Sequence, residues 1–370
     1  MRSIVAAAAL ASAGLALGKD TASLADAGRF AFVASRDAPE VAVLDGASDR
    51  VLTRIALGGV PRQVLVSEAA GLLVASFAAA SALEIVDLAA PVTSARLALP
   101  LAPDVMVLSP DGYLVALASR ASGAVAIMSL AKRQVLARLS GFADPRKVTF
   151  NLDGSQLYLT QSKTLEVIDI VQQKVVARMS LPSTGTGDVS ALTRTPDGRY
   201  GFVSLAGADA VAVVDLSTLQ LVKRVRVGHA PLRPYGTADG RLMLVPNEAD
   251  QSVSVIDTAT LAVAATLPGA KGVSSISTGW FESAAFVMGA DKRVVVLDLM
   301  KFKKLDDIEL PASPGAGVVT ANGQKLYAPL ADAGRVAVID TRTRKLRSLV
   351  DTSAGAPAAV ILARSNNYCH

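Results

Sequence analysis

The chain has 370 residues, of which 51% are hydrophobic and only 4% aromatic, and its formal net charge is +5. This small, dispersed positive charge excludes the concentrated basic stripe with aromatic stacking residues that nucleic-acid binding requires. The single cysteine, Cys369, excludes an internal disulfide, so stability must come from burial of Val, Leu, Ile and Ala and from hydrogen bonds.

Residues 1–18 have the features of a secretory signal peptide. Arg2 precedes an apolar run from Ile4 to Leu17, and small residues lead to a plausible cleavage point after Gly18. The apolar run is shorter than the roughly 20 residues that span a bilayer. We therefore expect a periplasmic or secreted protein without a transmembrane anchor. The alternative for this segment is a buried N-terminal helix.

An apolar strand that usually ends in aspartate returns eight times along the rest of the chain. Its final residues are Asp45, Asp87, Ser129, Asp169, Asp215, Asp257, Asp298 and Asp340. A period of roughly 42 residues is typical of β-propeller blades. The competing repeat architecture, an open solenoid, would need capping units at both ends.

Each repeat is predicted to hold four short strands, which in the first unit cover residues 29–34, 40–45, 50–57 and 63–67. Asp-Gly or Asn-Gly turns mark several repeats, because these dipeptides tolerate positive φ. They are Asp111-Gly112, Asp153-Gly154, Asp197-Gly198, Asp239-Gly240 and Asn322-Gly323.

The two ends of the chain are predicted to close the ring together. The first unit begins at a turn remnant, residues 26–28, without an inner strand before it, and the last unit continues into residues 358–362. The C-terminal segment is therefore expected to supply the inner strand of the first blade, which hides both sheet edges. The sequence thus predicts an all-β fold, a single eight-bladed propeller over residues 19–365, with a tail at 366–370.

The loops before the innermost strands and the loops between second and third strands should lie on one face of such a propeller. Those loops carry many basic residues, and we expect few acids among them. Arginine and lysine around a funnel attract anions, and arginine binds carboxylates bidentately. The alternative is that these side chains are only solvated. The candidate ligand-binding residues are Arg36, Arg62, Arg120, Arg146, Lys147, His229, Arg233, Tyr235 and Arg293.

Two places hold residues that could bind a metal. His229 is the only histidine inside the repeats, in a loop that Pro231 and Pro234 stiffen, and its imidazole could be an axial ligand or move a proton. Cys369 and His370 end the chain and are a weaker candidate, with a frayed terminus as the alternative. The last strand should carry them to the face opposite His229.

No catalytic motif is present in the sequence. It has no Gly-Xaa-Ser-Xaa-Gly elbow, no phosphate-binding glycine loop and no Cys-Xaa-Xaa-Cys-His motif for covalent haem. The aspartate that ends the repeated strand is expected to cap a turn, because equivalent copies in most repeats indicate a structural role. A non-catalytic protein is therefore the favoured reading.

The repeats resemble the YVTN-type propeller family, whose unit combines a Val-Ile-Asp strand end, a Val-Gly-Xaa-Xaa-Pro loop and a Pro-Asp-Gly turn. Residues 252–257 read Ser-Val-Ser-Val-Ile-Asp, and residues 227–231 read Val-Gly-His-Ala-Pro. The resemblance covers nearly the whole mature chain. It is specific for the fold and poorly specific for function.

With eight blades the chain also resembles the haem d1 domain of cytochrome cd1 nitrite reductase and its related maturation protein. That resemblance implies a carboxylate-rich tetrapyrrole held over the channel by basic residues, with a histidine near the iron. The positions that could play those parts are Arg62, Arg120, Arg146, Lys147, His229 and Arg233. The haem c domain of the reductase is missing from this chain.

Three functions follow as expectations. The first is a periplasmic binding or accessory propeller that supports a redox enzyme or cofactor pathway, with an anionic small molecule or a protein as its partner. Similar seven-bladed propellers, the heavy subunits of periplasmic amine dehydrogenases, are non-catalytic scaffolds. The second is a protein that binds or matures haem d1 or a related tetrapyrrole. The third is a surface interaction propeller.

Overall fold

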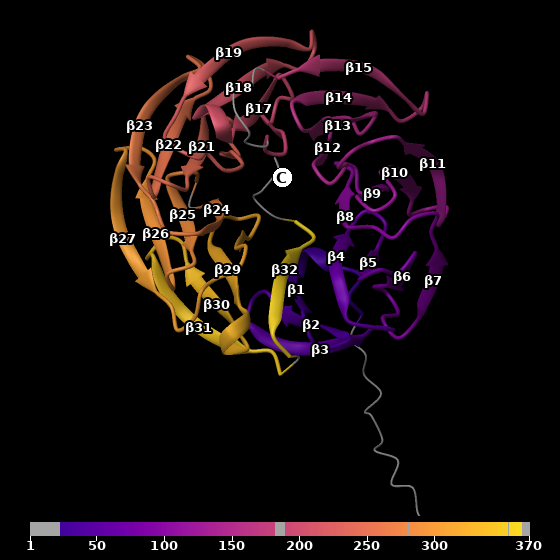
Figure 1. Cartoon of the computed structure of the whole chain (residues 1–370). Coiled ribbons are helices and arrows are strands. Elements are labelled where there is room, and N and C mark those ends of the chain that lie inside the picture. The colour runs from indigo at the N-terminus through magenta and orange to yellow at the C-terminus, as the bar shows by residue number, and fades with distance from the viewer. Residues whose placement is uncertain (1–22, 182–188, 280, 354, 365–370) are drawn as a thin grey trace, which may run out of the picture.

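The computed structural model describes residues 23–181, 189–279, 281–353 and 355–364 (Figure 1). The predicted signal peptide and the predicted tail with Cys369 and His370 lie outside the described residues. The boundaries expected for the domain therefore stay predictions.

The described residues form eight four-stranded antiparallel sheets arranged around a central axis (Figure 1). We number the sheets as blades 1 to 8 and give their strands from the axis outward. Blade 1 consists of β32 (Pro357–Leu362), β1 (Phe30–Ser35), β2 (Glu40–Asp45) and β3 (Arg50–Ala56), and blade 2 of β4 (Pro61–Ser67), β5 (Leu72–Phe77), β6 (Ala82–Asp87) and β7 (Ser94–Ala98). Blade 3 consists of β8 (Val105–Leu108), β9 (Leu114–Ser119), β10 (Ala124–Ser129) and β11 (Gln134–Ser140), and blade 4 of β12 (Val148–Phe150), β13 (Gln156–Gln161), β14 (Thr164–Asp169) and β15 (Lys174–Ser180). Blade 5 consists of β16 (Thr193–Arg194), β17 (Tyr200–Leu205), β18 (Ala210–Asp215) and β19 (Gln220–Arg226), and blade 6 of β20 (Tyr235–Gly236), β21 (Leu242–Asn247), β22 (Ser252–Asp257) and β23 (Ala262–Pro268). Blade 7 consists of β24 (Val273–Gly279), β25 (Ala284–Gly289), β26 (Arg293–Asp298) and β27 (Lys303–Glu309), and blade 8 of β28 (Val318–Val319), β29 (Lys325–Leu330), β30 (Arg335–Asp340) and β31 (Lys345–Asp351). The predicted eight-bladed, all-β propeller is confirmed.

Three single turns of 3-10 helix complete the described elements: η1 (Ala27–Arg29), η2 (Ala206–Ala208) and η3 (Ala331–Ala333). The first replaces the turn remnant expected at the start of the first blade.

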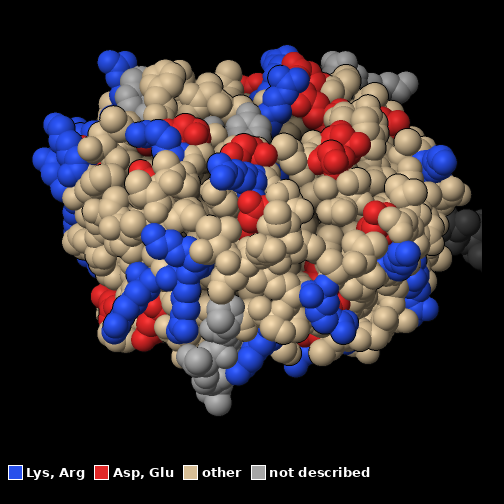
Figure 2. Space-filling model, turned by 90° about the horizontal axis from the view of Figure 1, so that it is seen from above, with Lys and Arg blue, Asp and Glu red and all other residues tan. Residues whose placement is uncertain are grey.

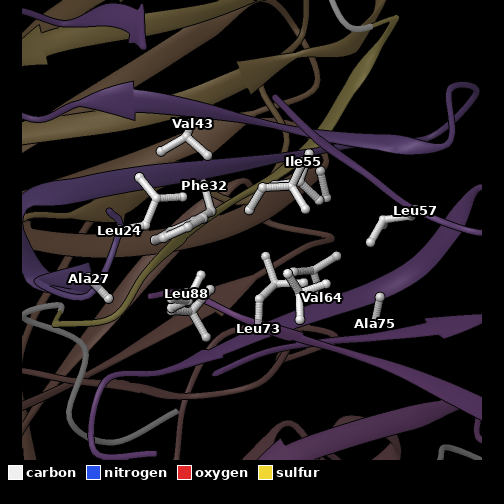
Figure 3. Packing of buried hydrophobic residues seen from close by; sticks show 14 of the residues in the cluster. Leu24, Ala27, Phe32, Val43, Ile55, Leu57, Val64, Leu73, Ala75 and Leu88 are labelled. Atoms are coloured by element: carbon white, nitrogen blue, oxygen red, sulfur yellow. The ribbon is translucent and has the colours of Figure 1, made fainter. Parts of the chain in front are cut away.

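The hydrophobic core is divided among the interfaces between neighbouring blades. Its eight clusters each combine residues of two adjacent blades, including one between blades 8 and 1. In the cluster between blades 1 and 2, Phe32, Val43 and Ile55 point toward Val64 and Leu73 (Figure 3).

The position of a strand in its blade explains its sequence pattern. The second and third strands are covered on both faces by neighbouring blades, and they read as continuous apolar runs, as in β25. The outermost strands are largely exposed, and some of them alternate in burial, as β15 does. The third strands differ from the second in the aspartate that usually ends them, which makes their repeat visible in the sequence.

The repeated aspartate caps the turn that follows the third strand, as predicted. In blade 6, Asp257 Oδ1 accepts hydrogen bonds from the backbone N–H groups of Ala259 and Thr260 at 3.0 and 2.8 Å. The bond from Thr260 is the largest cause that lowers the pKa of Asp257 below its ordinary value. A carboxylate that accepts such bonds stays ionised and holds the turn.

The ring closes through β32, which pairs antiparallel with β1 (Figure 1). Val33 lies opposite Val360, and Phe32 lies opposite Ile361. The C-terminal strand thus supplies the inner strand of the first blade, as predicted. Without it, β1 would expose a strand edge to the channel.

A buried polar cluster holds blade 8 against blade 1 at this seam. The Asp49 carboxylate accepts hydrogen bonds from the Tyr327 hydroxyl at 2.7 Å and from Lys325 Nζ at 2.8 Å, and Arg347 Nε lies 3.6 Å from its other oxygen. The Asp49 side chain is only 5% exposed. Burial and the Asp49 charge raise the pKa of Tyr327 well above its ordinary value, so the hydroxyl stays protonated as a donor.

Candidate functional site

The nine residues predicted to bind a ligand share one face of the propeller, which we call the upper face. It consists of the loops before the inner strands and the loops between second and third strands. Arg36, Arg120 and Arg293 lie at the second kind of loop, in blades 1, 3 and 7. The others lie at or next to the inner strands: Arg62 in blade 2, Arg146 and Lys147 in blade 4, and His229, Arg233 and Tyr235 in blade 6.

The expectation that few acids accompany these cations is wrong. Aspartates lie in the same loops and pair with the arginines. The pairs are Arg36 with Asp332 at 3.1 Å, Arg62 with Asp104 at 3.0 Å, Arg120 with Asp144 at 4.0 Å, Arg146 with Asp144 at 2.7 Å and Arg293 with Asp291 at 2.7 Å. On the side of the molecule that Figure 2 shows, basic and acidic side chains also lie next to one another.

Three of these pairs connect different blades. Arg36 and Asp332 join blades 1 and 8, Arg62 and Asp104 join blades 2 and 3, and Arg120 reaches Asp144 of blade 4. Exposed ion pairs of this kind contribute about 0–1 kcal/mol each to stability. The upper face is therefore a network of positioned, weakly paired charges.

The residues nearest the inner strands are more enclosed. Lys147 Nζ donates to the backbone oxygen of Val189 in the next blade, and Arg233 Nε donates to Thr193 Oγ1 at 3.4 Å. Tyr235 is half-buried against the cluster between blades 6 and 7, and burial raises the pKa of its hydroxyl. Tyr235 thus acts first as part of the blade packing.

A small cavity of about 180 Å³ opens beside blade 4 on the upper face. Lys147 and Asp144 line it together with Thr160, Gln161 and Ser162. Gln161 Oε1 accepts a hydrogen bond from the backbone N–H of Ala143 at 2.9 Å, which fixes the loop that carries Asp144. This volume is below the range of about 300–1,000 Å³ typical of small-molecule sites.

His229 is held by a carboxylate on each side. Its backbone N–H donates to Asp250 Oδ2 at 2.7 Å, and its ring nitrogen Nδ1 lies 2.9 Å from Asp250 Oδ1. The other ring nitrogen, Nε2, lies 3.8 Å from Asp209 Oδ2 of blade 5, beyond hydrogen-bond distance. Asp250 follows β21 in the same blade, so both kinds of upper-face loop build this site.

The local sequence explains how Asp250 approaches so closely. A Cβ atom at Gly228 would lie 2.5 Å from Asp250 Oδ2 and 2.7 Å from the side chain of Asn247, so only glycine fits. Ala230 has φ of 51°, and its N–H donates to Asp209 Oδ1 at 3.1 Å. The loop is therefore fixed by backbone bonds to both aspartates.

The hydrogen bond with Asp250 raises the pKa of His229 above its ordinary value of 6.5, and the charges of Asp250 and Asp209 add to the effect. The imidazole is 67% exposed. At neutral pH a larger fraction of His229 is therefore protonated than in a free imidazole, with Nδ1 as the donor to Asp250.

No group of three or more His, Cys, Asp and Glu side chains could hold a metal ion among the described residues. Cys369 and His370 lie outside them. The described end of the last strand lies on the face opposite His229, which we call the lower face, because Arg364 pairs there with Glu68 of the turn after β4.

Aspartates that were not predicted as site residues complete the upper face. Asp104, Asp144 and Asp332 lie in the same two loop classes as the arginines, and that shared position was the available signal. Asp104 follows its partner Arg62 by 42 positions, about one repeat. A search for opposite charges one period apart would have found this pair.

Fold and site together define an eight-bladed β-propeller with a charged upper face built by loops. The chain belongs to the YNCE-like β-propeller family, whose model matches residues 63–352, well over half of its length. No curated protein matches the sequence.

Solved structures share the fold at low sequence identity. The dihydro-haem d1 dehydrogenase NirN in complex with DHE has 16% identity and a TM-score of 0.72, over 91% of this chain and 76% of that one. Hydrazine synthase of Kuenenia stuttgartiensis has 18% identity and a TM-score of 0.56, over 76% of this chain and 95% of that one. The C-terminal WD40 domain of Sif2 has 15% identity and a TM-score of 0.64, over 76% and 82%. Within the described part of the chain, no helix is long and apolar enough to span a membrane.

Proposed function

We propose that this protein is an exported binding propeller that supports a redox enzyme or a cofactor pathway, and that its upper face binds an anionic ligand or a protein partner. The observation that carries the proposal is the shared position of the nine candidate residues. They come from blades 1, 2, 3, 4, 6 and 7, and their loops all open on one face.

The ion pairs of that face are compatible with binding. An exposed ion pair contributes only about 0–1 kcal/mol to the stability of the fold. A ligand carboxylate can therefore replace the aspartate that pairs with an arginine at a small cost in free energy. Asp104 holds Arg62 and Asp144 holds Arg146, which fixes the guanidinium groups before a ligand arrives. Side chains ordered in advance lose less entropy on binding.

Export is part of the same proposal and rests on residues 1–18. Their single arginine, apolar run and small residues match a cleaved leader.

The test is genetic and biochemical. Where an exported redox enzyme is encoded beside this gene, deleting the gene should lower the activity of that enzyme, and the wild-type gene should restore it. The purified chain should turn over none of that enzyme's substrates by itself. Turnover by the chain alone, or full activity of the redox enzyme without it, would contradict the proposal.

The arrangement of His229 favours a second candidate, a protein that binds haem d1 or a related tetrapyrrole. Metal-binding histidines commonly donate one ring N–H to a carboxylate while the other nitrogen binds the metal. Asp250 occupies Nδ1 of His229 in this manner, and Nε2 remains for an iron. Arg62 and Arg233 on the same face could pair with the carboxylates of the macrocycle. The similar solved structure of NirN is a complex with DHE.

A titration with ferric haem d1 distinguishes this candidate. Binding through His229 should give a saturable shift of the visible absorbance, and His229→Ala should change the spectrum of the complex. An absorbance that stays the sum of the free components, or an identical complex with His229→Ala, would rule it out.

A further inference from the structure

A cavity of about 420 Å³ opens on the lower face, at the seam where the ring closes. Its walls come from the start of blade 1, the turn after β2, the turn after β28 in blade 8 and the end of β32. The volume lies within the range of about 300–1,000 Å³ typical of small-molecule sites. The cavity lies on the opposite face from His229 and is independent of the function proposed above.

The cavity exists because blade 1 has no turn between its first and second strands. In other blades this turn packs on the turn of the preceding blade. A Cβ atom at Gly198 would lie 3.3 Å from Leu152, and one at Gly240 would lie 3.2 Å from Pro196. In blade 1 the first strand is C-terminal and the second is N-terminal, so in the described part of the chain no turn between them covers the corresponding surface of blade 8.

One residue of the cavity departs from the repeat. The turns of blades 3 to 6 have aspartate where the turn of blade 8 has Asn322. Asn322 Oδ1 accepts from Thr320 Oγ1 at 2.7 Å and from the N–H of Gln324 at 3.1 Å, as Asp239 Oδ1 accepts from Thr237 and Arg241. The turn therefore requires only one side-chain oxygen at this position, which asparagine and aspartate both supply.

The substitution changes what the cavity offers a ligand. It removes a negative charge from the wall and adds an amide group, Nδ2, that donates no hydrogen bond to the described residues. Asn322 thus preserves the turn, and it presents a hydrogen-bond donor to the cavity where an aspartate would present a second acceptor oxygen.

Arg29 supplies a cation at the same cavity. Its guanidinium lies over the Phe30 ring, 5.7 Å from the centroid, and its nearest acid is Asp45 at 3.9 Å. Among the described residues it makes no hydrogen bond, so the donors of its planar fork remain for a carboxylate. Phe30, Ala31 and Leu362 give the cavity an apolar wall.

The charge balance favours a singly charged ligand. Arg364 also lines the cavity, but Glu68 already pairs with it, and Asp45 lies near Arg29. The pKa of Asp45 is lowered, chiefly by the backbone hydrogen bond from Ser48, so this carboxylate stays charged. A dianionic phosphate would meet two acids, whereas a monocarboxylate needs only the Arg29 fork and the Asn322 amide.

We propose that this seam cavity binds a small monocarboxylate with an apolar or aromatic body. The carboxylate pairs with Arg29 and accepts a hydrogen bond from Asn322 Nδ2, and the body lies against Phe30 and Leu362.

The experiment is calorimetric titration of the full chain with phenylacetate and hexanoate, with phenylacetamide and inorganic phosphate as comparisons. At least one carboxylate should bind saturably, and phenylacetamide and phosphate should bind at least about tenfold more weakly, because a charged hydrogen bond contributes about 1.5–3 kcal/mol.

Three variants locate the site. Asn322→Asp restores the aspartate of the repeat, keeps the turn oxygen and should abolish binding. Arg29→Gln should weaken binding at least about tenfold. Asp239→Asn makes the reverse exchange in the matching turn of blade 6 and should leave the affinity unchanged. Absence of saturable binding by either carboxylate, or wild-type affinity in Asn322→Asp and Arg29→Gln, would overturn the proposal.

Discussion

Replacement of Asp49 by asparagine should weaken the seam between blades 8 and 1 far more than an exposed substitution would. Asp49 accepts from Tyr327 at 2.7 Å and from Lys325 at 2.8 Å, and its side chain is 5% exposed. Asparagine preserves the shape and tolerates the φ of 58° at this position, so the change isolates the charge.

The magnitude follows from the two partners. Hydrogen bonds to a charged group contribute about 1.5–3 kcal/mol each, and removal of one member of a buried pair costs about 3–5 kcal/mol. Asparagine keeps one oxygen acceptor but leaves the Lys325 ammonium, 14% exposed, without its counter-charge. We expect the free energy of unfolding to fall by about 3 kcal/mol.

The assay is urea unfolding followed by circular dichroism, with amide hydrogen exchange of β1 and β32 as a local readout. Asp209→Asn is the matched control, because Asp209 has φ of 48° and a side chain that is 37% exposed, and should cost less than about 1 kcal/mol. A loss below about 0.5 kcal/mol in Asp49→Asn, or equal losses in the two variants, would refute the role of this cluster in closing the ring.

Three further predictions concern the upper face. Because the pKa of His229 is raised, its hydrogen bond with Asp250 should stabilise the fold fully below pH 6.5 and lose this contribution as the pH rises through the raised pKa. An NMR titration of the imidazole should show the raised pKa in the wild type and a lower pKa in Asp250→Asn, with the Asp209 charge still contributing. A pKa in Asp250→Asn as high as in the wild type would contradict the assignment. Gly228→Ala should displace Asp250 and lower the pKa of His229 in the same titration, because the new Cβ has no room; an unchanged pKa would show that the loop adapts. A double-mutant cycle of Arg62→Ala and Asp104→Ala, measured by urea unfolding, should give a coupling of no more than about 1 kcal/mol, and a coupling above about 2 kcal/mol would mean that this pair has a structural role.

Much of the fold could be predicted because propeller signals are local and repeat. The aspartate that ends the third strand in seven of the eight blades caps a turn within its own hairpin, as Asp257 does, so the period of this strand end indicates the number of blades. The closure by β32 followed from counting strands, since β1 had no inner partner before it in the sequence.

The candidate site was harder to predict because its contacts cross between blades. Which acid meets Arg36 depends on the closed ring, since Asp332 lies at the far end of the chain. The seam cavity left only one trace in the sequence, Asn322 in place of the repeated aspartate. Asn322 indicates a binding site only when the closed ring is known, because only the ring brings it next to the start of blade 1, where the turn is missing from the described part of the chain.

The most direct test of the proposed function compares the two faces in a strain that lacks the gene. One variant reverses Arg62, Arg146 and Arg233 to glutamate on the upper face, and a control variant reverses Arg199, Arg241 and Lys301 to glutamate on the lower face. The activity of the exported redox enzyme that the gene deletion lowers is then measured at equal levels of the two variants. We predict that the lower-face variant restores this activity and the upper-face variant does not, whereas restoration by both, or by the upper-face variant alone, would contradict the account.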